Sequence, residues 1–259
     1  MIDLPASAIF AEALAERRIL AAATVAALSG LVRGFSGFGG AMIYVPLIAA
    51  IYDPRIAAVT LLLVDFLSST PFAVPEVRRC HWREVLPIAI ATAASIPLGT
   101  LLLIALDPVV LRWGIAALVL GLLAVLMSGF RYRGEPRLPV TLGVGFFAGI
   151  GAGAAQIAGP PVIIYWLSRG QSASTLRANL MVYFFFCGAV LIVSYAAQGL
   201  FTARTIALSL LLGVPYLLGV AIGARTFRGA SDRLYRRIAY LIIAFAALLS
   251  LPALDPLFR

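Results

Sequence analysis

The chain alternates eight apolar segments with short polar loops. Six of these segments are uninterrupted and lie at roughly 56–75, 85–106, 109–130, 180–197, 205–224 and 238–254. Two longer segments, at about 19–52 and 138–167, are interrupted by glycines. About 20 apolar residues are enough for a helix to cross a bilayer, and no segment alternates apolar and polar residues as barrel strands do. The pattern predicts an all-α integral membrane protein with several membrane crossings.

The glycine interruptions are the least regular parts of this pattern. Residues 34–40 read Gly-Phe-Ser-Gly-Phe-Gly-Gly, and residues 149–161 read Gly-Ile-Gly-Ala-Gly-Ala-Ala-Gln-Ile-Ala-Gly-Pro-Pro. Each glycine costs a helix about 1 kcal/mol relative to alanine. In lipid, unwound backbone survives only where protein or a water-filled cavity satisfies its polar groups. The two breaks therefore indicate binding sites, although small residues also allow helices simply to pack closely.

The two halves of the chain share one layout, with a broken segment followed by three ordinary spans. A shift of 119 residues places Gly34 on Gly153 and Gly40 on Gly159. This pattern predicts a first repeat at 1–130, a polar connector at 131–137 and a second repeat at 138–259. Secondary transporters are often built from such repeats, with broken helices that meet near the middle of the membrane.

The arginines predict how the broken segments lie in the membrane. If all eight segments crossed, the basic loops 78–83 and 131–137 would lie opposite the most basic loop, 225–237. If each broken segment is instead a re-entrant hairpin, 13 arginines fall on one side, 6 on the other and Arg33 within the membrane. The second arrangement obeys the positive-inside rule. We therefore expect two hairpins, two oppositely oriented repeats and both termini on the less basic side.

Composition excludes several other classes of protein. The chain is 62% hydrophobic and only 12% charged, and its net charge of +9 comes from arginines in short loops. A nucleic-acid-binding protein would group these arginines on a soluble domain. The two cysteines, Cys80 and Cys187, suggest neither a disulfide framework nor a metal site. We expect the lipid bilayer as a partner, with no nucleic acid, cofactor or metal, and small-residue helix faces leave a homo-oligomer open.

Two charged residues fall inside the apolar segments. In a hairpin that begins near Arg18, Arg33 lies about 15 residues deep, which is about 22 Å along a helix. It is either an anion ligand or a structural residue that caps freed carbonyls or reaches the opposite interface. Asp65 lies in the middle of the second segment, where a carboxylate serves proton coupling or pairs with an arginine. Arg33 is at a similar depth, so we expect an Asp65–Arg33 pair.

The breaks themselves predict an anion site. A half-helix restarts after each break, at about Ala41 and about Pro160. A helix N-terminus presents free N–H groups and partial positive charge to an anion. The expected lining residues are Arg33, Ser36, Gly37, Gly39, Gly40, Ala41, Gln156, Gly159 and Pro160. The Gln156 amide either donates to an oxyanion or satisfies unwound backbone.

Three other features have weaker functional interpretations. Arg177 and Asn179 begin the sixth span and are candidates for a cytoplasmic access route, although an arginine there is more often an interface anchor. The Gly34-Phe-Ser-Gly37 run is similar to the nucleophile motif of rhomboid-type intramembrane proteases. Such a serine needs a base within reach, and the single histidine, His81, lies in a basic loop. We therefore predict that the chain is not an enzyme.

The first break, in this setting, resembles that of the TauE/SafE family of membrane transporters. The resemblance lies in the glycines at positions 34, 37, 39 and 40 and in Pro46. In the second break, Gly159, Pro160 and Pro161 match the family pattern. Ala158 and Gln156 depart from it, because the family typically has glycine at both positions. The resemblance covers nearly the whole chain in length, repeat layout and motif placement.

This resemblance implies a multi-pass protein of the bacterial inner membrane that moves small sulfur-containing anions. We expect export of sulfite or of an organosulfonate such as sulfoacetate, by alternating access around a midplane site. The alternatives are an uptake carrier for anions, a cation carrier in which Asp65 is the ligand and, more distantly, a serine protease that uses Ser36. The departures at Gln156 and Ala158 fall where a ligand would bind, so they leave the choice of anion open.

Overall fold

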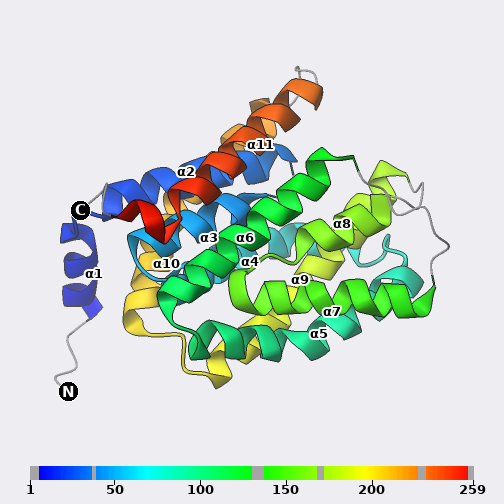
Figure 1. Cartoon of the computed structure of the whole chain (residues 1–259), viewed down its shortest axis with the longest axis horizontal. Helices are drawn as coiled ribbons and strands as arrows, with labels where there is room; N and C mark the ends of the chain where they lie inside the picture. Colours follow the sequence, from blue (N-terminus) through cyan, green and yellow to red (C-terminus); the bar gives the residue numbers. More distant parts are fainter. Residues whose placement is uncertain (1–5, 37–38, 130–136, 168–171, 227–231, 256–259) are drawn as a thin grey trace.

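The computed structural model describes residues 6–36, 39–129, 137–167, 172–226 and 232–255. All regular structure within these ranges is helical, as predicted (Figure 1). The helices are α1 (Ala6–Ala15), α2 (Ile19–Ser36), α3 (Gly40–Ile51), α4 (Pro54–Glu76), α5 (Trp82–Ala105), α6 (Pro108–Met127), α7 (Leu138–Ala155), α8 (Gly159–Leu167), α9 (Ala173–Ala197), α10 (Ala203–Thr226) and α11 (Asp232–Leu249), followed by the short 3-10 helix η2 (Pro252–Leu254).

Six of the described helices are long and apolar enough to cross a membrane. They are α4, α5, α6, α7, α9 and α10, so five of the six uninterrupted segments form the expected spans. In the last segment, predicted at 238–254, α11 ends at Leu249, and Ala239–Leu249 is a shorter apolar stretch among the described residues. A proline at 252 begins η2 and cannot extend the helix, because it offers no N–H to the helix backbone.

Both broken segments fold back on themselves as hairpins. At the open end of the first hairpin, Arg18 before α2 donates from Nη1 to the carbonyl of Ile51 at the end of α3, at 3.2 Å. At the open end of the second, the hydroxyls of Thr141 in α7 and Tyr165 in α8 lie 2.6 Å apart. Each hairpin therefore returns to the level at which it started. These contacts support the predicted re-entrant arrangement, while the symmetry between the halves stays a prediction.

The hydrogen bonds sort the loops into two ends of the molecule. At one end, Arg55 of α4 donates to the Ile104 carbonyl of α5 at 2.8 Å, and Arg204 of α10 pairs with Glu16. At the other end, Asn179 of α9 accepts from the backbone N–H of His81, which joins the loop 76–84 to the start of α9. We call this second end the basic end, since the loop 76–84 and the start of α7 supply its arginines.

Both breaks are shorter than the sequence predicted. Helix α2 continues through Ser36, and α3 begins at Gly40 rather than at Ala41. Helix α7 continues through Ala155, and α8 begins at Gly159. The glycines at the start of each predicted break are therefore helical. Their lack of a side chain serves another purpose, which is close contact between helices.

The first arm of each hairpin packs against a helix from the other half. Helix α2 packs along α10, and α7 packs along α5. A Cβ on Gly34 would collide with the carbonyl of Val220, and one on Gly153 would collide with the carbonyl of Ile96. Small residues at such positions let helix backbones approach closely in membranes. The packing interpretation is thus correct for these two aligned glycines, and it fixes both hairpins against the opposite half.

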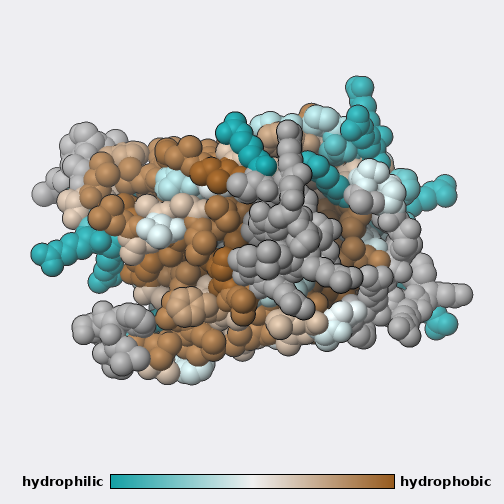
Figure 2. Space-filling view, turned by 90° about the horizontal axis from the view of Figure 1, so that it is seen from above, coloured by the Kyte–Doolittle hydropathy of each residue, from teal (hydrophilic) through white to brown (hydrophobic). Residues whose placement is uncertain are grey.

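Helices α4 and α9 pack against each other between the two hairpins. The outer surface of the molecule is apolar between its two ends, as a surface in contact with lipid must be. Figure 2 shows hydrophobic residues over most of this face, with most hydrophilic side chains gathered towards the ends. Helix α1 and η2 lie at the end opposite the basic end (Figure 1).

Candidate functional site

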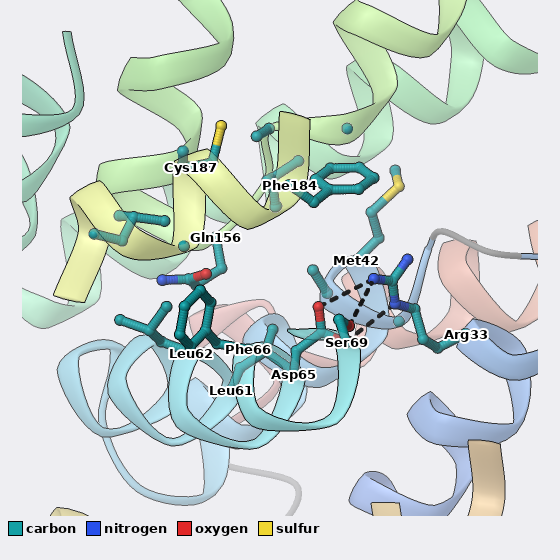
Figure 3. A pocket seen from close by; sticks show the side chains of 18 of the residues that line it. Arg33, Met42, Leu61, Leu62, Asp65, Phe66, Ser69, Gln156, Phe184 and Cys187 are labelled. Atoms are coloured by element: carbon teal, nitrogen blue, oxygen red, sulfur yellow. Dashed lines mark hydrogen bonds and ion pairs between the residues drawn. The ribbon is translucent and has the colours of Figure 1, made fainter. Parts of the chain in front are cut away.

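A cavity of about 90 Å³ lies where the two breaks meet α4 and α9. Residues of 39–42 line it from the first break, and residues 156–160 line it from the second. The middle of α4 contributes residues between 61 and 70, and α9 contributes residues between 184 and 191. Arg33 of α2, Ala152 of α7 and Tyr216 of α10 also line it. Figure 3 shows that these side chains converge from helices far apart in the sequence.

Arg33 and Asp65 form an ion pair within this cavity (Figure 3). Arg33 donates from Nε to Oδ1 of Asp65 at 3.1 Å and from Nη2 to Oδ2 at 3.2 Å. Both side chains line the cavity, and they are 17% and 31% exposed. Two parallel hydrogen bonds of this kind hold an arginine in a fixed orientation. The structure thus forms the pair that the sequence suggested.

Two further side chains hold the pair in place. The hydroxyl of Tyr216 donates to Oδ1 of Asp65 at 2.8 Å, and Tyr216 itself is 1% exposed. On the other side, the guanidinium carbon of Arg33 lies 5.5 Å from the centre of the Phe184 ring. A cation over an aromatic face is stabilised by the ring quadrupole. The charge pair is therefore held between two aromatic side chains, Tyr216 and Phe184.

Gln156 lies at the second break with an unusual backbone. Its φ is 58° and its ψ is 20°, the left-handed conformation that ends α7. It is the one non-glycine residue with a positive φ in the described part of the chain. Its Nε2 donates to the hydroxyl of Tyr195 at 3.4 Å, and that hydroxyl donates to the carbonyl of Gly153 at 2.8 Å. The amide thus lines the cavity and is also tied to freed backbone.

The two helix N-termini differ in what they offer to an anion. Gly39 precedes α3 with φ 90°, which only glycine adopts easily, and the N–H groups of Gly40 and Ala41 come before the first hydrogen bond of the helix, from Met42 to the Gly39 carbonyl. At α8, positions 160 and 161 are prolines, which have no N–H group. Pro160 lines the cavity but cannot itself donate, so binding of an anion at the N-terminus near Pro160 stays a prediction that depends on the N–H groups of other residues. At this break, polar groups come from Gln156 and from the backbone before the prolines.

Several predicted site residues are not part of the cavity as described. Gly37 and the side chain of Ser36 lie outside the described residues. Arg177 is exposed near the start of α9 and does not line the cavity. Asn179 is fully buried, and its Nδ2 donates to Oε2 of Glu84 at 3.3 Å. Its contacts with this carboxylate and with the 76–84 loop give Asn179 a structural role rather than a place on an access route.

The structure also adds residues that sequence reasoning missed. Tyr216 bonds Asp65, Ser69 lies 3.5 Å from Nη2 of Arg33, and Phe184 faces the guanidinium. The sequence offers one hint of a role for Tyr216, which is its place directly after Pro215 in the middle of an apolar span. No set of three or more His, Cys, Asp or Glu residues that could hold a metal ion occurs in the described ranges.

Comparison with known proteins identifies the family of this chain. The family model described as "Sulfite exporter TauE/SafE" matches residues 22–250. The chain belongs to the TauE/SafE family. No curated protein and no solved structure matches the chain significantly. Membership establishes a membrane transporter rather than an enzyme, so the serine protease alternative at Ser36 is excluded, and the matched region of the TauE/SafE model contains both breaks and the whole cavity.

Proposed function

We propose that this TauE/SafE protein exports a small sulfur-containing anion, sulfite or an organosulfonate such as sulfoacetate. The observation that carries the proposal is the single cavity lined by both helix breaks and by Arg33. Family membership supports anion transport, and the cavity volume of about 90 Å³ suits a small ion. We further propose that the protein lies in a bacterial inner membrane with both termini on the periplasmic side.

In the proposed binding mode, three sources of positive potential converge on the anion. Arg33 supplies a full charge, the N-terminus of α3 supplies N–H groups at Gly40 and Ala41, and Gln156 supplies a neutral donor. A charge-assisted hydrogen bond contributes about 1.5–3 kcal/mol, and a helix N-terminus adds a smaller favourable term. No covalent step is needed, because the ion only has to bind on one side and leave on the other after the site changes its access.

Alternating access fits the way in which the hairpins are packed. Each hairpin is fixed to a helix of the opposite half by glycine contacts, α2 to α10 and α7 to α5. These contacts favour motion of packed pairs as rigid bodies around the cavity, which is the usual form of alternating access in repeat-built transporters. An inside-negative potential of 100 mV contributes about 2.3 kcal/mol per exported negative charge. That contribution favours export over uptake for an anion.

The ion pair weighs against the alternative of a cation carrier. A cation bound at Asp65 would lie beside the guanidinium that already holds both carboxylate oxygens. Like charges at such a distance repel strongly in a site of low dielectric constant. An anion carrier avoids this repulsion, because the anion adds a second partner for Arg33.

The proposal is tested by direct binding of sulfite, sulfate, thiosulfate, sulfoacetate and acetate to purified protein. We expect a sulfur anion to bind best and Arg33→Gln to weaken its binding by roughly tenfold to a hundredfold, because one charged hydrogen-bond donor is lost. Arg112→Gln is the matched control. Arg112 also pairs with an aspartate, Asp255, at 2.7 Å, but it lies outside the cavity. Full sulfur-anion affinity in Arg33→Gln would overturn the proposal.

A further inference from the structure

We propose that Asp65 couples transport to a proton: the substrate anion displaces its carboxylate from Arg33, and the displaced carboxylate takes up one proton. This inference rests on the proposed function, since it needs an anion in the cavity. It adds the coupling ion, its binding group and the stoichiometry. The family match provides none of these.

The first argument is competition for one guanidinium. The carboxylate of Asp65 engages both Nε and Nη2 of Arg33, which is the paired-donor edge that recognises planar and tetrahedral oxyanions. An incoming oxyanion that bonds this edge must replace the carboxylate. Asp65 therefore occupies the edge of Arg33 that the substrate anion would need.

The second argument is charge balance. Arg33 and Asp65 together are neutral, and the described residues that line the cavity include no other arginine or carboxylate. A bound monovalent anion would leave one net negative charge in a partly enclosed site, where the interaction between charges is much stronger than in water. Protonation of the Asp65 carboxylate restores neutrality. The exchange balances, because the proton comes from solvent and one oxygen of the carboxylate accepts it.

The third argument is that Tyr216 can hold Asp65 in both states. Its hydroxyl donates to Oδ1 of the ionised carboxylate at 2.8 Å. A hydroxyl is both donor and acceptor, so it can accept a hydrogen bond from the neutral carboxylic acid after reorientation. Asp65 also lines the cavity, with its side chain 31% exposed, so a proton can reach it through the same space as the anion.

The other titratable groups near Asp65 cannot replace it between pH 5 and 8. They are Arg33 on α2, Tyr44 on α3, Cys187 on α9 and Tyr216 on α10. Arginine, tyrosine and cysteine all have ordinary pKa values above about 8. The single histidine, His81, precedes α5 at the basic end and is not among the residues that line the cavity. A proton taken up with the anion near neutral pH is therefore assigned to Asp65.

Proton uptake also fixes the charge that moves. A monovalent sulfonate would cross with its proton as a neutral pair. Divalent sulfite, or fully ionised sulfoacetate with its sulfonate and carboxylate, would still have one negative charge when it crosses with one proton, so an inside-negative potential would still favour its export.

The test counts protons during binding to the full-length protein. Titration calorimetry with sulfoacetate between pH 6 and 8 is repeated in buffers of different ionisation enthalpy. Sulfoacetate stays fully ionised in this range, so protons taken up belong to the protein. We expect nearly one proton per bound anion, and affinity that falls about tenfold per pH unit while the empty site is ionised. Sulfite is the second probe, with its own titration subtracted.

Two variants locate the proton. Asp65→Asn keeps a partner for Tyr216 but cannot ionise, so we expect proton uptake to disappear and anion affinity to become independent of pH. Asp53→Asn is the control on the same helix. Asp53 caps α4 through the backbone N–H of Arg55 and lies outside the cavity, and asparagine caps equally well. This variant should bind with one proton, as the unmodified chain does.

The outcomes separate the inference from the proposed function. Anion binding without proton uptake in the unmodified protein overturns the inference and leaves anion transport intact. Proton uptake that persists in Asp65→Asn assigns the proton elsewhere and also overturns it. Absence of binding by every anion tested overturns the proposed function and this inference together.

Discussion

At the scale of single residues, Gln156 combines a strained backbone with a polar side chain in the cavity. A left-handed conformation costs a residue with a Cβ about 1–2 kcal/mol. Its φ of 58° would suit glycine, the residue that the TauE/SafE pattern typically has there. Such strain persists when the surrounding structure enforces it, often at functional sites. We interpret the position as one where the side-chain amide, which lines the cavity, is needed despite the backbone strain.

Substitution of Gln156 tests this interpretation. Gln156→Gly should preserve or raise the melting temperature in detergent, because it removes the strain, while it changes the order of anion affinities. Gln156→Ala keeps the strain and also loses the amide. We expect it to be less stable than Gln156→Gly, with the same altered anion preference. If both variants kept the original order of anion affinities, the amide of Gln156 would serve only to satisfy the freed backbone and would not contact the anion.

Asn179 gives the opposite prediction, since its polar groups serve the fold. Its amide accepts from the His81 N–H at 2.8 Å and donates to Glu84, so it joins α9 to the loop between α4 and α5. A buried donor left without its acceptor costs about 1–3 kcal/mol. Asn179→Ala should lower thermal stability by about this amount and leave the anion dissociation constant unchanged. A large loss of anion affinity at normal thermal stability would instead indicate that Asn179 takes part in anion access, as the sequence suggested.

Residue types alone could locate part of this site. Two opposite charges in apolar segments were enough to suggest the Arg33–Asp65 pair. Tyr216 and Phe184 gave no comparable signal, because aromatic residues are common in apolar spans and only tertiary packing brings them to the pair. The prolines at 160 and 161 are visible in the sequence, and their missing N–H groups leave fewer backbone donors at the start of α8 than at the start of α3.

At the scale of helices, glycine contacts hold the hairpins in place. Gly34 of α2 and Gly153 of α7 each face a carbonyl of a partner helix with no space for a methyl group. Overpacking of this kind costs about 1–3 kcal/mol. Gly34→Ala and Gly153→Ala should therefore lower stability by about that amount. Anion affinity should fall only if the added methyl group displaces the adjacent break, which lines the cavity.

Gly114 supplies the matched control for these two variants. It lies in α6, and a Cβ there would meet nothing within 4 Å. Alanine is a better helix former than glycine by about 0.5–1 kcal/mol, so Gly114→Ala should be neutral or slightly stabilising. Thermal unfolding of the three variants in one detergent checks the contrast. Equal stability in all three would mean that the glycine contacts do not hold the hairpins.

Helix boundaries show why the sequence overestimated the breaks. Glycine propensity marks where a helix is weak, but it does not distinguish a glycine that unwinds a helix from one that packs against a neighbour. Gly34 and Gly153 pack, whereas Gly39, with φ 90°, unwinds. That distinction depends on which helix lies alongside. It could not be read from the chain, because the partner helices are distant in sequence: Gly34 meets Val220, and Gly153 meets Ile96.

At the scale of the whole molecule, the hairpin topology divides the charge unevenly. It assigns 13 arginines and the acids Glu76, Glu84, Glu135 and Asp232 to the basic side. The other side receives 6 arginines and six acids, and the pair of Arg33 and Asp65 is neutral. The entire net charge of +9 therefore falls on one side. Such an excess of arginine marks the cytoplasmic side of short-loop membrane proteins.

Cysteine labelling in intact cells tests this topology. In a background with Cys80 and Cys187 replaced by alanine, one cysteine is placed at Arg79 and another, separately, at Gln198. Arg79 lies in the loop after α4 with its side chain 75% exposed, and Gln198 is exposed between α9 and α10. The hairpins place these two loops at opposite ends. We expect an impermeant maleimide to label the Gln198→Cys protein in intact cells and the Arg79→Cys protein only after permeabilisation.

The same pair of variants distinguishes the hairpin topology from eight simple crossings. The Arg79 loop follows the first broken segment, and the Gln198 loop follows both. If both broken segments crossed, four crossings would separate the two loops, at about 85–106, 109–130, 138–167 and 180–197. An even number of crossings would place both loops on one side. With a hairpin at 138–167, only three crossings separate them, and they lie on opposite sides. Labelling of both cysteines from the same side would therefore contradict a re-entrant second hairpin, whatever the orientation of the whole protein.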